Sequence, residues 1–246
     1  MPQPAARKWY FTGTDTDVGK TYVASLAVAE VRHSGHRVAV YKPVASGCQQ
    51  RGESRVSPDA ESLWRSAGEP GDLDAVCPQR FIAPLAPPAA AELEGRHVDE
   101  ARLVSGLDAV VGDADFVVIE GAGGLLSPLS TGMLNSDLAA RFDAELVIVA
   151  ANRLGTIHQV LATVLAAKTL GLPILGIVLS DVAEPLDPSA ASNAATLRRF
   201  TSVPLLGQVA HGAIETGIDW CSLAVPQRPP AEVPGDLEAG MTRAWL

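Results

Sequence analysis

The sequence predicts a doubly wound α/β fold, with a mainly parallel β-sheet flanked by helices. Short strand-like runs such as FVVI and LVIVA alternate with longer amphipathic runs along most of the chain. The strand-like runs are apolar throughout, which is typical of a parallel sheet that helices cover on both sides. Ligands of such folds bind at the carboxyl ends of the strands, so functional residues are expected in the loops that follow them.

The expected elements begin with a strand over residues 9–12, a glycine-containing loop and a helix over 21–33 that Gly35 ends. A helix over 160–170 separates two later strands. The Pro/Ala-rich stretch 84–91 is expected to be a loop, because the α/β pattern resumes on both sides. Residues 1–246 are expected to form a single domain with an irregular Pro-rich segment at about 221–236. Further strands are expected over 37–41, 116–119, 146–150, 174–179 and 205–209.

Composition and charge disfavour several classes of partner. The net charge is −9 and the pI is about 5.0, whereas a nucleic-acid or anionic membrane partner requires a basic surface. No apolar run approaches the roughly 18 residues that span a bilayer, and residues 1–8 lack the apolar core of a signal peptide. The three cysteines form no CxxC motif, as expected of free thiols in a reducing compartment. We therefore expect a cytoplasmic protein with neither a nucleic-acid nor a membrane partner.

The most specific motif is GTDTDVGKT at residues 13–21, between an expected strand and an expected helix. This is the context of a P-loop, in which backbone N–H groups and the positive end of the helix bind phosphate oxygens. Gly19 allows the backbone close to the phosphates, Lys20 reaches the β- and γ-phosphates, and the Thr21 hydroxyl ligates Mg²⁺. The motif narrows the fold to a P-loop NTPase-like one and predicts binding of a nucleoside triphosphate with Mg²⁺.

The loop departs from the standard motif at one position. Thr14 stands where the first glycine is expected, and the nearest glycine, Gly13, is one residue earlier. The alternative interpretation is a GKT triplet that occurs by chance at the start of a helix. The strand before the motif and the helix after it favour a variant P-loop.

Three charged residues outside the loop are candidates for the same site. Glu120 ends the apolar run 116–119 and precedes the glycine cluster 121–124, where a carboxylate that holds Mg²⁺ belongs. The alternative is a plain strand end followed by a turn. Lys42 follows an expected strand and could offset charge on a phosphate or carboxylate, although an isolated lysine there is more often solvated. Asp59 on its own indicates only a residue near the start of a helix.

Four segments in this order resemble the dethiobiotin synthase family: residues 12–21, YKPVASG at 41–47, EGAGG at 120–124 and LGTI at 154–157. PLLG at 204–207 is similar to a late element of the same family. The likeness runs from about residue 9 to 210, and the phosphate loop together with the KPVASG block is its most specific feature. The resemblance implies an ATP-dependent cyclo-ligase that forms C–N bonds in biotin biosynthesis.

The family's reaction, as the resemblance implies, consumes 7,8-diaminopelargonic acid, CO₂ and ATP with Mg²⁺. One amine captures CO₂ as a carbamate, whose oxygen attacks the γ-phosphate to give a mixed carbamic-phosphoric anhydride. The second amine closes the ureido ring and expels phosphate, which leaves dethiobiotin and ADP. Positioning and charge stabilisation dominate such a reaction, because the protein has little covalent work to do.

The resemblance also implies a role for each matching residue. Lys20 and Lys42 are the expected catalytic residues, and Thr21, Asp59 and Glu120 are the expected Mg²⁺ ligands. The family is a homodimer, in which backbone N–H groups at the helix start Leu154, Gly155, Thr156 and Ile157 reach the substrate carboxylate in the other subunit. The remaining expected substrate contacts are Thr16, Lys42, Ser46 and Gly123, and the expected nucleotide contacts are Asp17, Val18, Gly19, Lys20, Thr21, Asp59, Glu120, Ser180 and Asp181.

Three positions depart from the family pattern. Asp17 stands where the family carries a glutamate, and His158 stands where it carries an asparagine. Ser180 precedes Asp181 at the position of an asparagine that reads the adenine base. A serine hydroxyl cannot make the bidentate contact of an amide, so we expect relaxed base selectivity, with CTP or GTP able to replace ATP.

Three other functions fit parts of the pattern. A partition- or septum-type ATPase switch carries a signature lysine five residues before the P-loop lysine, where this chain has Asp15, and needs a basic amphipathic anchor. An amidotransferase-type synthetase needs a glutaminase domain, for which the roughly 36 residues after the last strand are too few. A binding module without catalysis has no need of Lys20, Thr21 and Glu120 together. The deviant P-loop switch is the main alternative.

Overall fold

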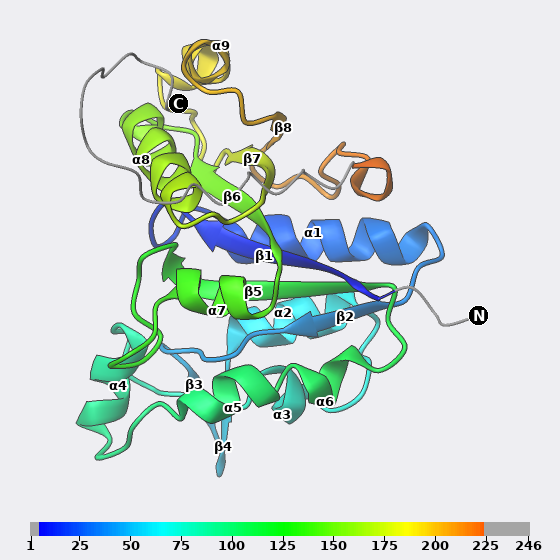
Figure 1. Cartoon of the computed structure of the whole chain (residues 1–246), viewed down its shortest axis with the longest axis vertical. Coiled ribbons are helices and arrows are strands. Elements are labelled where there is room, and N and C mark those ends of the chain that lie inside the picture. The colour runs from blue at the N-terminus through cyan, green and yellow to red at the C-terminus, as the bar shows by residue number, and fades with distance from the viewer. Residues whose placement is uncertain (1–4, 224–246) are drawn as a thin grey trace.

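The computed structural model describes residues 5–223. Six strands form one sheet in the order β2-β5-β1-β6-β7-β8, and every neighbouring pair is parallel. In Figure 1 the strands of this sheet run toward the left of the view, where their carboxyl ends lie. The predicted parallel α/β sheet is confirmed. The strands are β1 (Arg7–Gly13), β2 (Val38–Tyr41), β5 (Phe116–Gly124), β6 (Glu145–Ala151), β7 (Ile174–Ser180) and β8 (Leu205–Val209), and a separate hairpin joins β3 (Gln49–Arg51) to β4 (Ser54–Val56).

The helices lie between the strands along the chain. Within residues 5–223, no helix is both long enough and apolar enough to cross a membrane. The helices are α1 (Lys20–His33), α2 (Pro58–Ser66), α3 (Leu73–Val76), α4 (Pro87–Leu93), α5 (Glu100–Ser105), α6 (Asp108–Val111), α7 (Asn135–Arg141), α8 (Thr156–Thr169), α9 (Ala190–Phe200) and the 3-10 turn η1 (Trp220–Ser222).

Both faces of the sheet are buried, and alternate residues of a strand enter different cores. In β1, Trp9 and Phe11 pack on the side of α1 and α2, whereas Tyr10 packs on the side of α5 and α7. In β6, Val147 joins the first of these cores, and Ile148 packs with α8 and α9 in a third. Since helices cover both faces, these strands need apolar residues on both faces, as WYF in β1 and LVIVAA in β6 show.

The structure corrects three expected boundaries. β5 continues through the glycine cluster to Gly124 instead of ending at residue 119, because β1 pairs with it as far as Gly13. α8 begins at Thr156 instead of residue 160. The stretch 84–91 is not wholly a loop, because α4 begins at Pro87. Proline is favourable at the first helical position, where its φ is already suitable and its missing N–H has no helical partner.

Several elements carry no signal in the apolar pattern. β3 and β4 have three residues each and are largely exposed, and α3 and α6 have four residues each. Three or four residues are too few to show the apolar periodicity from which a helix or strand is predicted. Residues 224–236 of the expected Pro-rich segment lie outside the described residues.

The segment that follows β8 packs against α1, which is the helix that the P-loop opens. The hydroxyl of Tyr22 donates to the carbonyl of Ala213. The carboxylate of Glu30 accepts from the backbone N–H of Thr216 and, at 2.6 Å, from its hydroxyl. These contacts hold the chain beyond β8 beside the phosphate-binding helix.

Trp220 anchors this segment in the core. Its ring centroid lies 5.6 Å from that of Trp9 and 5.8 Å from that of Phe11, and its Nε1 donates to the Thr216 hydroxyl at 2.9 Å.

We expect Trp220→Ala to lower the free energy of unfolding by about 3–5 kcal/mol, because the variant leaves a cavity beside β1. Urea denaturation measures this change. The control is Ile214→Ala, at a side chain that is 90% exposed, and an equally small change in both variants would contradict the anchoring role.

Candidate active site

A cavity of about 940 Å³ lies at the carboxyl ends of the strands. Its wall combines the P-loop, the KPVASG block, the start of α2, the glycine cluster of β5 and the residues after β7 and β8. These segments are distant in the sequence, and the parallel sheet brings them to one edge. The expected site residues that line the cavity are Thr16, Asp17, Gly19, Lys20, Thr21, Lys42, Ser46, Asp59, Glu120, Gly123, Ser180 and Asp181.

The P-loop has a backbone that suits phosphate binding. Gly19 precedes α1 with φ 87°, a left-handed conformation that glycine adopts without strain. A Cβ at Gly13 would lie 2.4 Å from the carbonyl oxygen of Asp15, so this position has no room for a side chain. Gly13 therefore lets the loop fold back on itself, with the Asp15 carbonyl against it. Val18 is fully buried in the core and does not line the cavity.

Lys20 folds back over the loop that precedes it. Its Nζ lies 3.3 Å from the carbonyl oxygen of Asp15, and the residue is 8% exposed. Burial lowers the pKa of Lys20, the charge of Glu120 opposes this shift, and the charge of Lys42 adds to it. A largely buried ammonium group gains when an anion binds beside it, so Lys20 is placed to attract a phosphate.

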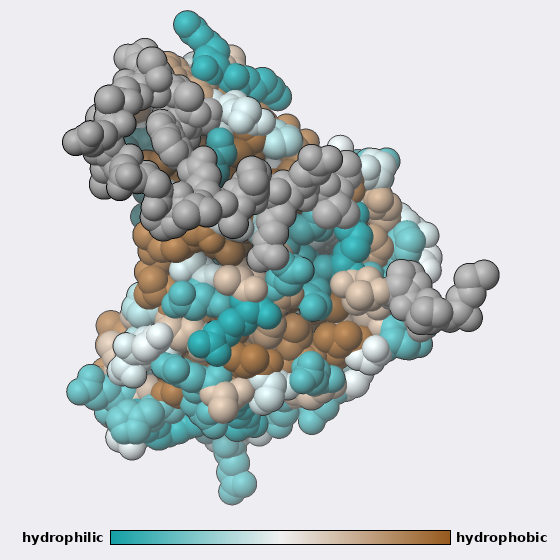
Figure 2. Space-filling view, in the orientation of Figure 1, coloured by the Kyte–Doolittle hydropathy of each residue, from teal (hydrophilic) through white to brown (hydrophobic). Residues whose placement is uncertain are grey.

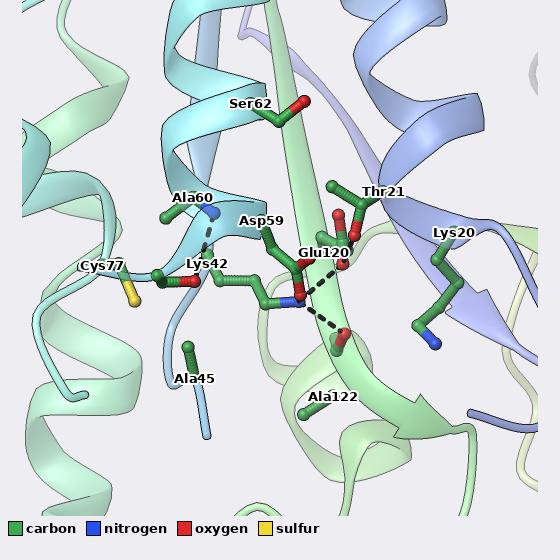
Figure 3. Close-up of polar contacts among 12 residues, drawn as sticks. Lys20, Thr21, Lys42, Ala45, Asp59, Ala60, Ser62, Cys77, Glu120 and Ala122 are labelled. Atoms are coloured by element: carbon green, nitrogen blue, oxygen red, sulfur yellow. Dashed lines mark hydrogen bonds and ion pairs between the residues drawn. The ribbon is translucent and has the colours of Figure 1, made fainter. Parts of the chain in front are cut away.

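Lys42 is buried between two carboxylates and is not a solvated lysine. It is 3% exposed, and its Nζ lies 3.0 Å from Asp59 Oδ2 and 2.5 Å from Glu120 Oε1. Figure 3 shows its side chain pointing toward both carboxylates, with Lys20 on the other side of Glu120. Burial disfavours the charge of Lys42, but attraction by Glu120 and Asp59 outweighs burial and raises its pKa. The charge of Lys42 in turn lowers the pKa of Asp59.

Glu120 has one satisfied and one unsatisfied oxygen. It is fully buried, and its Oε1 accepts from the Thr21 hydroxyl at 2.8 Å. Its Oε2 is buried without a hydrogen-bond partner among the described residues. Asp59, on the second residue of α2, faces the same place because Ser57 caps that helix by accepting from the N–H of Ala60. Three elements thus bring a hydroxyl and two carboxylates together around Lys42.

The glycines after Glu120 have different reasons for lacking a side chain. Glycine lets the backbone approach a ligand closely, but a Cβ at Gly121 would lie 2.3 Å from Oδ1 of Asn135, and one at Gly124 would lie 3.2 Å from the carbonyl oxygen of Gly13. Those two positions are restricted by the protein itself. Gly123 has φ 74°, which favours glycine, and it lines the cavity.

The end of β7 carries the residues expected to bind the base. Ser180 is 1% exposed, and its hydroxyl would lie 2.4 Å from a Cβ at Gly19, so it packs against the P-loop. Two amides orient the Asp181 carboxylate: Nδ2 of Asn152 donates to it at 2.8 Å, and Nε2 of Gln208 donates to it at 2.9 Å. Asn152 and Gln208 belong to no motif, and the pairing of β6, β7 and β8 is what reveals their contact with Asp181.

The segment 154–157 does not line the cavity of its own chain. Leu154 is 82% exposed, and Gly155, with φ 94°, precedes α8. The first turn of α8 has neither an acidic residue nor a side-chain cap. The positive end of this helix is therefore suited to an anion, and its expected role in a second subunit's site stays a prediction.

Several cavity residues carry no chemical motif that the sequence could reveal. One group precedes and begins α4, in the Pro/Ala stretch, and a second follows β7 and β8. The first group has no polar side chain, so only the three-dimensional arrangement shows that it borders a site. These residues are Pro84, Leu85, Ala86, Pro87, Val182, His211 and Gly212.

The chain has relatives among proteins of known function. Residues 7–213 match the family model described as an AAA domain. The ATP-dependent dethiobiotin synthetase of Rhodopirellula baltica is 46% identical, over 83% of this chain and 84% of that protein. The chain belongs to the dethiobiotin synthetase family. The dethiobiotin synthetase of Anaeromyxobacter dehalogenans strain 2CP-C is 44% identical, over 79% of this chain and 86% of that protein, and the expected family resemblance is confirmed.

The dethiobiotin synthetase fold is shared with more distant P-loop proteins. Chloroplast FtsY from Physcomitrella patens has a TM-score of 0.54 at 15% identity; the match covers 87% of this chain and 62% of FtsY, less than two thirds of that protein. The septum site-determining protein MinD from Pyrococcus horikoshii, complexed with Mg-ADP, has a TM-score of 0.50 at 16% identity, over 84% of this chain and 82% of MinD. At these identities the likeness shows the fold alone, and it does not favour a septum-type switch over a dethiobiotin synthetase.

Proposed function

We propose that this cavity carries out the ATP-dependent synthesis of dethiobiotin from 7,8-diaminopelargonic acid and CO₂. The observation that carries the proposal is the placement of Lys20 and Lys42 on the two sides of Glu120 in one cavity (Figure 3). Lys20 belongs to a phosphate-binding loop, and Lys42 belongs to the KPVASG block. A γ-phosphate near Lys20 and a carbamate near Lys42 would each meet an ammonium group.

In this proposal the protein positions the reactants and stabilises their charge. The carbamate oxygen forms a bond to the γ-phosphorus while the bond from that phosphorus to ADP breaks. The second amine then attacks the carbamate carbon, and phosphate leaves as the ring closes. Thr16 and Ser46 hydrogen-bond the reacting groups, and the backbone of Gly123 borders the diamine. Such positioning lowers the barrier because the reactants meet already oriented.

The nucleotide is proposed to lie along the P-loop and the ends of β7 and β8. Its phosphates contact Asp17, Gly19 and Thr21, and its base lies toward Ser180 and Asp181. The cavity wall supports this placement, because it runs from the P-loop to the residues after β7 and β8.

We propose Mg²⁺ as the cofactor, held by Thr21, Asp59 and Glu120. The unpartnered buried Oε2 of Glu120 supports this donor set, because a cation supplies what that oxygen lacks. Within residues 5–223, no group of three or more His, Cys, Asp or Glu side chains could hold a metal. Phosphate oxygens would therefore complete the ligand set, as is usual for Mg²⁺. When bound, Mg²⁺ neutralises the charge that develops on the phosphates.

We propose a homodimer of single-domain chains that comprise residues 1–246. Figure 2 shows hydrophobic surface beside the lower end of α8, and α8 carries Leu165, which is 44% exposed. The same helix begins with the segment 154–157, which does not line the cavity of its own chain. A second subunit would account for both features. Analytical ultracentrifugation measures the oligomeric state, and a monomer at every concentration would contradict the dimer.

We propose a cytoplasmic location without a nucleic-acid or membrane partner. Cys48, Cys77 and Cys221 are free thiols, as is common in reducing compartments. The net charge of −9 opposes binding to nucleic acid or to anionic lipid.

The test of the function is phosphate release by the purified protein with ATP, Mg²⁺ and bicarbonate, with and without 7,8-diaminopelargonic acid. We expect release that depends on the diamine, together with dethiobiotin detected by mass spectrometry. Release that is indifferent to the diamine would favour a P-loop ATPase switch instead.

Relaxed base selectivity is expected in the same assay. Ser180 has no amide with which to read adenine, and its hydroxyl packs against Gly19. We expect kcat/KM with CTP or GTP to lie within about 10-fold of that with ATP, because one neutral hydrogen bond contributes only about 1 kcal/mol. Turnover that ATP alone supports, at saturating triphosphate, would contradict this expectation.

A further inference from the structure

The structure assigns a positioning role to Asn135, a residue outside every motif of the site, and this assignment rests on the proposed function. We infer that its side-chain amide clamps the end of β5 after Glu120 and thereby sets the position of Gly123 at the substrate. Asn135 is the first residue of α7 and is fully buried.

Both ends of the Asn135 amide form hydrogen bonds, which reach the end of β5, the loop after it and β1. Its Oδ1 accepts from the hydroxyl of Tyr10 at 2.8 Å and from the backbone N–H of Ala122 at 3.1 Å. Its Nδ2 donates to the carbonyls of Ala122, Gly124 and Ser127 at 2.8, 2.9 and 3.0 Å. A side-chain amide accepts at its oxygen and donates from its nitrogen, whereas a carboxylate has no donor and an aliphatic side chain has neither group.

The partners of the amide are themselves held in place. Burial raises the pKa of Tyr10, so its hydroxyl keeps its proton and remains a donor. Gly121 must lack a side chain because a Cβ there would lie 2.3 Å from Oδ1 of Asn135 and 3.0 Å from the ring of Tyr10. The glycine at 121 and the asparagine at 135 therefore form one packed unit.

The clamped segment is the end of β5, and it borders the substrate side of the cavity. It begins directly after Glu120, whose carboxylate contacts Thr21 and Lys42. It ends at Gly124, where a Cβ would lie 3.2 Å from the carbonyl oxygen of Gly13. Ala122 and Gly123 lie between these ends and line the cavity. Without the amide this segment loses its side-chain bonds to α7, so we expect the cavity wall at Ala122 and Gly123 to shift.

Steady-state kinetics of Asn135→Ala test this inference. We expect kcat/KM for the diamine to fall by about 100-fold, because misplacement of about 1 Å at a reacting centre costs that much. The affinity for ATP in the presence of EDTA, measured by calorimetry, is expected to change by less than about threefold, since the P-loop amides are untouched. Equal losses in diamine turnover and in ATP affinity would overturn the positioning role.

Gln79→Ala is the matched control. Gln79 is also a buried amide that pairs with backbone on both ends, through the carbonyl of Asp99 at 3.0 Å and its N–H at 2.8 Å, but it does not line the cavity. The kcat/KM of Gln79→Ala for the diamine is expected to stay within about threefold of the wild-type value. If Gln79→Ala loses as much diamine turnover as Asn135→Ala, the effect is general destabilisation and the inference is wrong.

Tyr10→Phe covers the case in which Asn135→Ala does not fold. It removes one of the bonds to Oδ1 and keeps the ring against Gly121, so we expect a smaller loss of diamine kcat/KM, about 5- to 10-fold. Unchanged kinetics in Tyr10→Phe would contradict the clamp.

Hydrogen exchange separates the clamp from the proposed function. Amides of residues 121–127 are expected to exchange faster in Asn135→Ala, or in Tyr10→Phe, than in the wild type, and unchanged exchange would refute the clamp. This readout needs no substrate. A wild-type protein without diamine-dependent turnover would refute the proposed function and leave the exchange result to decide on the clamp.

Discussion

Lys20→Ala is expected to lower diamine-dependent phosphate release by about 10³-fold, because it removes a cation from the site of phosphoryl transfer. The Lys20 ammonium is largely buried over the P-loop, at 3.3 Å from the carbonyl oxygen of Asp15. No solvated group can replace it there once the nucleotide fills the cavity. Initial rates at saturating ATP and diamine measure the effect.

The control for Lys20 is Lys168→Ala, which removes the same charge from the last turn of α8. Lys168 does not line the cavity, so the rate of diamine-dependent phosphate release by Lys168→Ala is expected to stay within about twofold of the wild type. The two variants should unfold at similar urea concentrations. A rate for Lys20→Ala within 10-fold of the wild type would show that the P-loop lysine does not carry the reaction.

Lys42→Met is expected to abolish detectable turnover and to lower the free energy of unfolding by about 3–5 kcal/mol. The variant keeps the volume of the side chain but leaves Glu120, which is fully buried, without its ammonium partner. Asp59 is less affected, because 49% of its side chain is exposed to solvent. Urea denaturation, together with the phosphate-release assay, measures both effects.

The double variant Lys42→Met/Glu120→Gln separates the two effects of Lys42. It removes the unpaired buried charge, so it is expected to recover about half or more of the stability that Lys42→Met loses, with no recovery of turnover. If the double variant is less stable than Lys42→Met, the instability does not come from the buried carboxylate. If Lys42→Met is as stable as the wild type, the contact between Lys42 and Glu120 contributes nothing to folding.

Much of the fold was predictable because its signals are local. β8 has the predicted bounds, and β1, β2, β6 and β7 lie within a few residues of theirs, since each contains a run of mainly apolar residues. The family was predictable for a similar reason, because the P-loop and the KPVASG block are contiguous segments. The loop expected at 84–91 was partly wrong, because the two prolines there begin α4.

The motifs indicated many of the residues that line the cavity, but not how they are arranged. Lys42 alone indicated a solvated side chain, yet its partners are 17 and 78 positions away in the sequence. The sequence offered no reason for a glycine at 13 or 121 beyond the motif, and in the structure their missing side chains make room for Asp15 and for Asn135. Asn135 itself gave no signal, because an asparagine at a helix start is common.

Sequence alone was sufficient to predict the parallel α/β class, the phosphate loop and membership in the dethiobiotin synthetase family. The spacing of apolar residues and the contiguous motifs are properties of single segments of the chain. The three-dimensional structure was needed for the pairing of Lys42 with Glu120, the orientation of Asp181 and the clamp by Asn135. Those contacts depend on the strand order β2-β5-β1-β6-β7-β8. Strand order follows from how whole layers pack, and no local pattern specifies which side chains then meet.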